Sequence, residues 1–172
     1  MASRVSGRTA SARGGSGGGS TATPTGPTTT TTRTKKGGPV ITIVKGPNGR
    51  LERASATIKP ENIGKGTGTT EASRREARGM GKDTDDAGHA IGNNLGGPGG
   101  LTSGNTFPFD PHTNRGEFSQ FEQDVADEVR DGKDVQVVVT PNYDKPEDTR
   151  PSSVTYEVTI DGETTTREFD NP

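Results

Sequence analysis

Four polar side chains in the middle of the chain have types and spacing suited to phosphate chemistry. His89 ends the acidic, glycine-containing run DDAGH, and Asn105, Asn114 and Glu122 follow it. An imidazole can accept a proton near neutral pH, because its unperturbed pKa lies near ~6.5. An asparagine carbonyl is a hard oxygen ligand that suits Mg²⁺, an ion that keeps several waters and binds substrate phosphates. A base and a single metal ion are the parts needed to hydrolyse a phosphodiester, so these residues predict nuclease chemistry.

One amphipathic segment must position two of these residues. Its apolar side chains recur at spacings of three and four, which predicts one buried helical stripe over residues 114–130, ended by Gly132. Asn114 lies at the start of this helix, so a metal ligand and a helix N-cap are both open interpretations. Glu122 lies at the edge of the stripe, and its alternative is an acid that faces solvent. The stripe consists of Phe118, Phe121, Val125 and Val129.

The rest of the ordered chain has the pattern of antiparallel strands. Residues 40–44 and 51–58 flank a turn with the pair Asn48-Gly49, and residues 154–160 and 163–169 flank Asp161-Gly162. A further strand is expected at 135–140. The short segment 105–109 is extended, but its proline argues against a central strand. We therefore expect a small α+β domain with an antiparallel sheet and one main helix.

A basic cluster precedes the histidine motif. It lies on and after a short predicted helix at 71–78 and could contact the phosphate backbone. A solvated helix face is the alternative. A guanidinium from this cluster could also stabilise the charge that develops on phosphorus. The cluster consists of Arg74, Arg75, Arg78 and Lys82.

Composition divides the 172 residues into two parts. Residues 1–39 contain six basic residues, no acidic residue and long runs of Gly, Ser, Thr and Pro, whereas the rest holds 15 basic and 23 acidic residues. This predicts a disordered basic linker or tail at 1–39, and one domain at 40–172. Cysteine is absent, which excludes disulfides and thiolate zinc sites. Neither a signal peptide nor a membrane span is expected from the hydrophobic pattern.

The assembled motifs resemble the DNA/RNA non-specific endonucleases of the ββα-metal class. They are similar to the branch found as C-terminal modules of bacterial polymorphic toxins, and the resemblance covers about residues 50–170. The matching segments, in order, are DDAGHAIGN, NTFPFD, NRGEFSQFE, VQVVVTPNY and RPSSVTYEVTIDG. The resemblance implies a ββα-metal nuclease core within the α+β domain.

The resemblance also implies a role for each motif residue. His89 would be the general base, and Asn114 would bind Mg²⁺ directly, with Mn²⁺ as an alternative ion. Asn105 and Glu122 would position the hydrated metal. Asp86 opens the Asp-x-Gly-His motif, and a carboxylate beside the imidazole can fix its tautomer.

Three positions depart from the pattern of the family: Phe118 replaces the usual helix tryptophan, Ala90 replaces a frequent leucine, and the third bears on catalysis. Where a better-known branch has an arginine directly after the first Asp of the motif, this chain has Ala87. The arginine that stabilises the transition state must then come from elsewhere, and Arg75 or Arg78 are the candidates.

The expected substrate is DNA, RNA or both, and a toxin module implies a cognate immunity protein as partner. The expected location is the bacterial cytoplasm before delivery, or outside the cell by a route that uses no signal peptide. Three alternatives stay open: an inactive module of the same fold that only binds nucleic acid, a metal site formed by His89 with His112 and Asp110, and a scavenging nuclease rather than a toxin.

Overall fold

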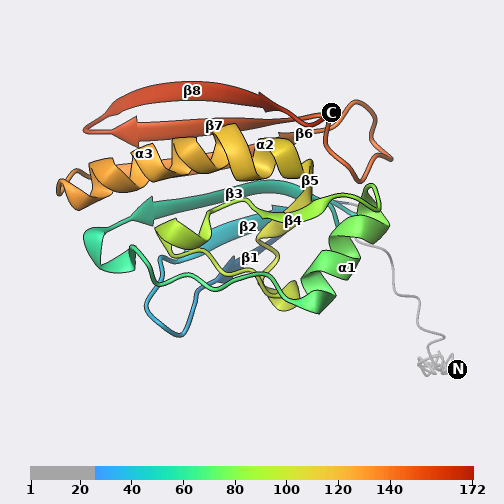
Figure 1. The fold of residues 1–172 in the computed structure, drawn as a ribbon, viewed down its shortest axis with the longest axis horizontal. Helices are drawn as coiled ribbons and strands as arrows, with labels where there is room; N and C mark the ends of the chain where they lie inside the picture. The colour runs from blue at the N-terminus through green and yellow to red at the C-terminus, as the bar shows by residue number, and fades with distance from the viewer. Residues whose placement is uncertain (1–25) are drawn as a thin grey trace, which may run out of the picture.

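A computed structural model describes residues 26–172 and shows an α+β fold built on one large sheet. The six strands are all antiparallel and lie in the order β1-β2-β3-β6-β7-β8 (Figure 1). The strands predicted from the sequence are confirmed, with small shifts at their ends. The strand bounds are β1 Thr28–Thr32, β2 Ile41–Lys45, β3 Leu51–Ile58, β6 Val135–Asn142, β7 Ser153–Ile160 and β8 Glu163–Asp170.

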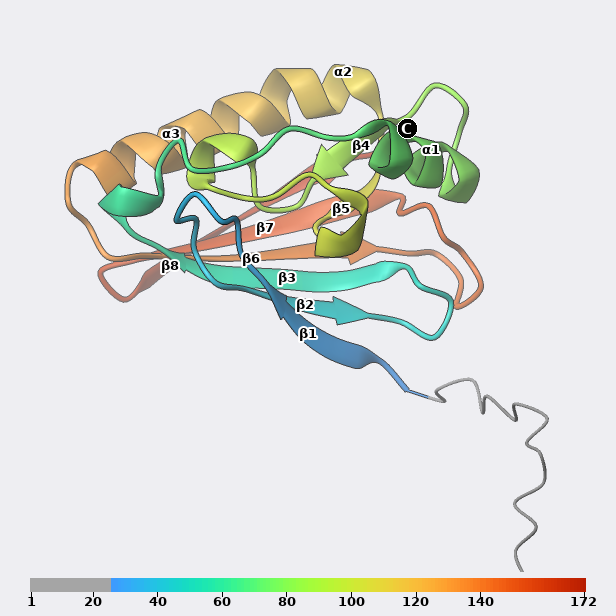
Figure 2. The same ribbon diagram turned by 90° about the horizontal axis from the view of Figure 1, so that it is seen from below.

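Within residues 26–172, all other elements cover one face of this sheet and leave its second face open (Figure 2). The covering layer contains helix α1 (Glu71–Met80), helix α3 (Ser119–Arg130) and the strand pair β4 (Asp86–His89) and β5 (Thr106–Phe109). The core lies between the two layers because the inward positions of the strands are apolar, with Val139 paired to both Ala54 and Tyr156. As its proline predicted, β5 lies outside the large sheet, and in the part of the chain that the structure describes it pairs only with β4.

The strand pair leads directly into the main helix and forms a ββα unit with it. The helix begins at α2 (Pro111–Thr113), earlier than predicted, because the Asp110 carboxylate caps it by accepting from Thr113 N at 3.1 Å. Asn114 therefore lies inside the helix, and the N-cap interpretation of this residue is wrong. A π-helical segment (Asn114–Phe118), in which Gly116 departs from helical geometry, then joins α2 to α3. Such segments often occur at functional sites.

The ordered domain begins before the predicted boundary at Val40. Strand β1 lies within the segment assigned to a disordered tail, and it pairs with β2 through Thr30 and Ile43, for example. Threonine is β-branched and suits an extended strand, so the low complexity of this stretch concealed its β propensity. The tail prediction is wrong for residues 26–39, and residues 1–25 lie outside the described part of the chain.

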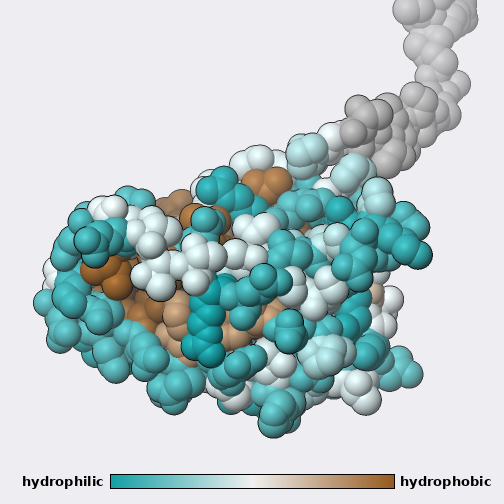
Figure 3. All heavy atoms as spheres, turned by 90° about the horizontal axis from the view of Figure 1, so that it is seen from above, coloured by the Kyte–Doolittle hydropathy of each residue, from teal (hydrophilic) through white to brown (hydrophobic). Residues whose placement is uncertain are grey.

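Hydrophilic side chains dominate the face that Figure 3 shows, apart from a hollow in which apolar side chains are visible. On β8, the Arg167 guanidinium lies 5.5 Å from the Phe121 ring centre and 4.7 Å from that of Phe169. Stacking of this kind covers part of the apolar edge between β8 and α3. Within residues 26–172, no helix has the length and hydrophobicity needed to cross a membrane.

Candidate active site

A cleft of about 830 Å³ lies between α3 and the turns that follow β3 and β4. The α3 side carries Glu122, and the opposite side is formed by Gly64 and the turn at 92–94. His89 and Asn114 also line the cleft, so the structure brings together three of the four residues with which the sequence argument began. The fourth, Asn105, does not line it.

His89 ends β4, and its imidazole is held by one backbone carbonyl. The ring lies 2.8 Å from Thr67 O through Nε2. Because a carbonyl only accepts, Nε2 must carry the hydrogen, which leaves Nδ1 as the free acceptor. Burial lowers the pKa of His89, and the hydrogen bond to Thr67 partly opposes this effect. The ring is therefore neutral at pH 7 and able to take a proton at Nδ1.

Strand pairing explains the glycine before His89. Gly88 is buried and pairs with Phe107, and a Cβ atom there would collide with the ring of Phe109. The glycine in this motif therefore allows close packing inside the ββα unit.

Asp86 orients Asn114 and, within residues 26–172, forms no side-chain hydrogen bond with His89. Its Oδ2 accepts from Asn114 Nδ2 at 2.9 Å, and Arg115 donates to Oδ2 from Nε at 2.9 Å and to Oδ1 from Nη2 at 2.7 Å. Since the Asn114 nitrogen is used, its carbonyl oxygen is the atom left free for a ligand. The expected role of Asp86 in fixing the histidine tautomer is filled by Thr67 instead.

Glu122 is buried on the wall of the cleft, with 6% of its surface exposed. Its Oε2 accepts from Gly92 N at 2.7 Å, and a side chain at position 92 would collide with this carboxyl group. Burial raises the pKa of Glu122 to about 8, and the Gly92 hydrogen bond opposes the rise. The alternative interpretation, that Glu122 is an acid facing solvent like its neighbours on the helix, is therefore wrong.

Tyr156 is the buried neighbour of Glu122 on β7. Each group influences the pKa of the other, but the geometry is outside that of a normal hydrogen bond. Tyr156 Oη is thus the one buried side-chain polar atom without a hydrogen-bond partner among residues 26–172. The rings of Phe118 and Phe121, centred 5.6 and 5.0 Å from that of Tyr156, hold it in this position.

Asn105 is fully buried and holds the loop that follows His89. Its Oδ1 accepts from Ile91 N at 3.0 Å, and its Nδ2 donates to Ile91 O and Pro98 O, each at 2.9 Å. Its backbone oxygen also accepts from Ala90 N. With its amide used in this way, Asn105 shapes the cleft wall through the loop, whereas the resemblance implied that it positions a hydrated metal.

The basic cluster on α1 does not line the cleft. Arg75 is exposed and pairs with Glu71 at 3.1 Å, one helical turn away. Arg74 donates to Thr69 O at 3.0 Å and so supports the segment that carries Thr67. Arg78 is exposed in the last turn of this helix, and Lys82 is exposed just after the helix ends. The structure therefore does not bring the predicted transition-state arginines, Arg75 and Arg78, to the site.

Arg115 lies in the cleft next to Asn114, and the sequence did not predict its place there. It follows Asn114 directly, and the π-helical segment turns both side chains toward Asp86. In a regular helix, successive side chains point in different directions, so the sequence gave no reason to expect Asn114 and Arg115 to bind the same carboxylate. The signal in the sequence that could have identified Arg115 is its position directly after Asn114.

The donor atoms in the cleft fit a divalent cation that keeps most of its waters. Among the described residues there is no group of three His, Cys, Asp or Glu side chains that could enclose a metal. The alternative site with His112 and Asp110 is therefore not assembled, and His112 is exposed on α2 outside the cleft. The free carbonyl of Asn114 and the carboxyl of Glu122 are hard oxygen donors, as Mg²⁺ prefers.

Comparison with known proteins agrees with this geometry. Residues 46–162 match the family model of the DNA/RNA non-specific endonucleases. A protein of Dickeya dadantii (strain 3937) described as "Probable deoxyribonuclease RhsA" is 39% identical over 122 residues. This region is 71% of the present chain but only 8% of that relative.

Two solved nucleases share the fold. NucA from Streptococcus agalactiae with a bound magnesium ion superposes with a TM-score of 0.59 at 17% identity, covering 86% of this chain and 82% of that one. Sda1 nuclease with a bound zinc ion gives a TM-score of 0.57 at 17% identity, covering 86% and 84%. The fold is that of the ββα-metal nucleases, and the family model extends over most of the ordered domain. The chain belongs to the DNA/RNA non-specific endonuclease family.

Proposed function

We propose that this domain hydrolyses phosphodiester bonds with a divalent metal ion, using His89 as general base and Asn114 as the protein ligand to the metal. The observation that carries the proposal is the pairing of two oriented side chains in one cleft. Thr67 holds His89 so that Nδ1 is free, and Asp86 holds Asn114 so that its carbonyl is free.

His89 would take a proton from the attacking water at Nδ1. A general base must be unprotonated at the operating pH and within reach of the water. The lowered pKa of His89 meets the first condition, and its place on the cleft wall supports the second. The bond to Thr67 O would become stronger as the ring gains charge, because charged donors form stronger hydrogen bonds.

Asn114 and Glu122 would hold Mg²⁺ or Mn²⁺ together with its waters. When bound, such an ion stabilises the negative charge that develops on the phosphate and on the leaving oxygen. Asp86 would keep the Asn114 carbonyl aimed into the cleft. Glu122 would accept hydrogen bonds from the waters of the ion, in addition to the one it accepts from Gly92. Asn105 would act indirectly, through the loop it holds.

Arg115 replaces Arg75 as the proposed guanidinium at the reacting phosphate. Its Nε and Nη2 bind Asp86, whereas Nη1 forms no hydrogen bond within the described structure. A guanidinium that is fixed on one side can place its free donor without further ordering, which favours stabilisation of developing charge. The cluster Arg74, Arg75, Arg78 and Lys82 keeps its proposed role as a separate contact to the phosphate backbone.

DNA is the substrate that we favour. The relative that is 39% identical is described as a probable deoxyribonuclease. The chemistry itself addresses phosphates rather than bases, so cleavage is expected at many sequences. Because the matching region is 8% of that relative, the domain could act as one module of a larger protein, in line with the resemblance to toxin modules.

Digestion of plasmid DNA by the 172-residue chain tests the proposal, with and without Mg²⁺. His89→Ala and Asn114→Ala should each remove cleavage, since loss of a general base typically costs ~100- to 10,000-fold. His112→Ala is the matched control, because this second histidine is exposed outside the cleft. Cleavage that survives His89→Ala would refute the assignment of the base. Folded protein that binds DNA but never cuts it would favour an inactive binding module.

Expression in a bacterial host tests the proposed toxin role. The active chain should arrest growth from within the cytoplasm, and His89→Ala should restore it. Co-expression of a neighbouring gene that encodes an immunity protein should also restore growth. Equal growth with and without that gene, in cells that contain active nuclease, would count against a toxin and favour a scavenging enzyme.

A further inference from the structure

The cleft offers little free positive charge to a polyanion. Both of its arginines are already ion-paired, Arg115 with Asp86 at 2.7 Å and Arg130 with Asp127 at 2.8 Å. Because phosphate contacts supply most of the affinity of non-specific binding, a nuclease of this kind needs cations beside the cleft.

The loop between β1 and β2 lies against the wall of the cleft through a series of hydrogen bonds. Thr34 Oγ1 donates to Lys65 O at 2.6 Å, and Lys36 Nζ donates to Gly66 O at 3.3 Å. Gly64, next to Lys65, lines the cleft and donates from its backbone nitrogen to Asn94 O. The β1–β2 loop thus lies behind the turns at 62–66 and 92–94, and both of these turns line the cleft.

Three lysines stand on this outer layer. Lys35, Lys36 and Lys65 are all exposed, and none forms an ion pair with another residue of the described chain. We name them the basic rim. Lys35 and Lys65 also form no side-chain hydrogen bond within residues 26–172, so their charges are fully available to a ligand.

We propose that the basic rim binds the phosphate backbone of DNA on the nucleotides that flank the cleavage site. This inference rests on the proposed nuclease function and adds a substrate-binding surface to it. The rim comes from a segment that composition assigned to a linker, yet hydrogen bonds hold it beside the cleft. The rim acts on substrates long enough to reach from the cleft across the turn at 62–66, and its effect disappears for a single phosphodiester.

The double variant Lys35→Ala/Lys65→Ala tests the rim without disturbing the loop, because only backbone atoms of Lys65 take part in docking. Binding is measured in the His89→Ala background on a synthetic DNA duplex over a range of salt concentrations. Each lost phosphate contact lowers the salt slope by about 1, so the slope should fall by about 2. Lys35→Arg/Lys65→Arg should retain the slope. In the active enzyme, KM for DNA should rise more than kcat falls.

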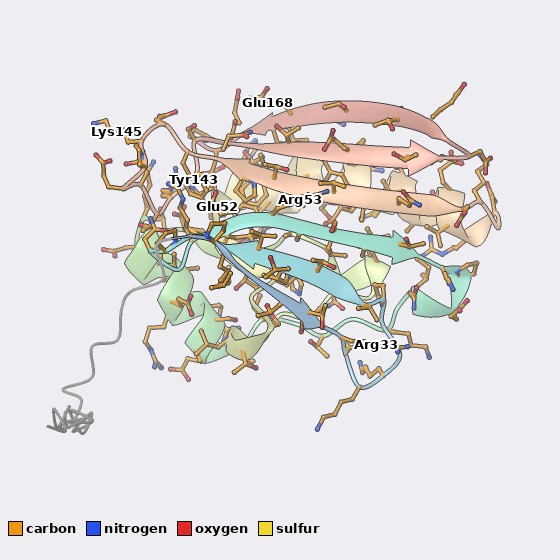
Figure 4. All side chains as sticks on the ribbon, turned by 180° about the vertical axis from the view of Figure 1, so that it is seen from behind. Arg33, Glu52, Arg53, Tyr143, Lys145 and Glu168 are labelled. Atoms are coloured by element: carbon orange, nitrogen blue, oxygen red, sulfur yellow. The ribbon has the colours of Figure 1, made fainter. Side chains whose placement is uncertain are left out.

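Arg53→Ala/Lys145→Ala is the matched control, with the same loss of two charges. Arg53 lies on the open face of the sheet, and Lys145 lies at the opposite end of the molecule from Arg33 of the β1–β2 loop (Figure 4). This control should keep the salt slope of the unchanged protein. An equal fall in both double variants would show a general charge effect and overturn the proposal. An unchanged slope in Lys35→Ala/Lys65→Ala would also overturn it.

Failure of the nuclease function would be visible separately. Hydrolysis of a nitrophenyl phosphodiester by the unchanged chain with Mg²⁺ reports the chemistry without the rim. If this hydrolysis is absent, the proposed reaction fails, whereas the binding comparison in the His89→Ala background still decides whether the rim holds DNA.

Discussion

Replacing Glu122 with glutamine should make the metal-free protein more stable at pH 8 and leave it almost unchanged near pH 4.5. In the folded protein burial raises the pKa of Glu122 to about 8, whereas the unfolded chain has the ordinary value of 4.5. Between these values the folded state binds the proton more tightly, so the free energy of unfolding falls as pH rises. Below pH 4.5 the carboxyl group is protonated in both the folded and the unfolded state. Above pH 8 the folded state carries the full free-energy cost of burying the charge.

The size of the effect follows from the two pKa values. At 1.36 kcal/mol per pH unit, the interval from 4.5 to about 8 corresponds to an upper limit of about 5 kcal/mol. Water that enters from the cleft reduces this, so we expect about 2 to 5 kcal/mol at pH 8. Glutamine is similar in shape to glutamate, and its oxygen can still accept the hydrogen bond from Gly92 N. The variant should therefore remove the charge without creating a cavity.

Urea unfolding in EDTA at several pH values between 5 and 9 measures the difference. Asp124→Asn, which neutralises an exposed carboxyl group on the same helix, is the control and should follow the wild-type curve. Adding Mg²⁺ should stabilise the wild type more at pH 8 than at pH 5, because a metal favours the deprotonated carboxyl group. Parallel stability curves for the wild type and Glu122→Gln would refute the argument that burial of this charge is costly.

Three further predictions follow from the site. The pKa that governs the acid limb of the kcat/KM profile should be below 6.5, because burial lowers the pKa of His89 and the base stays neutral as pH falls. An acid-limb pKa above 6.5 in a pH–rate series would contradict this. Gly92→Ala should reduce nuclease activity by about 10- to 100-fold, since its methyl group displaces the Glu122 carboxylate; full activity in a plasmid assay would show that this contact is unimportant. Arg150→Ala should destabilise the domain by about 3 kcal/mol, because Asp85, with 1% of its side chain exposed, loses its ion pair; an unchanged urea midpoint would contradict the buried pair.

The sequence by itself determined most of the elements and the residue types of the site. Local patterns predicted the strands at 135–140 and 154–160, the helix after Asn114 and the turn at Asp161-Gly162, and the structure contains each of these elements. The spacing of the motifs around His89, Asn114 and Glu122 also identified three side chains that line one cleft. Local patterns suffice here because strand and helix periods are set by neighbouring residues.

Tertiary structure alone decided how those side chains are held. The carbonyl of Thr67 fixes the His89 tautomer across 22 residues, and Gly92 meets Glu122 across 30. No sequence period relates such pairs, because they depend on how separate loops pack together. The β1–β2 loop shows the same limit. Its composition is that of a linker, and only pairing with β2 and docking on the turn at 62–66 place it beside the cleft. Composition describes what a segment could do alone, whereas its partners decide whether it is ordered.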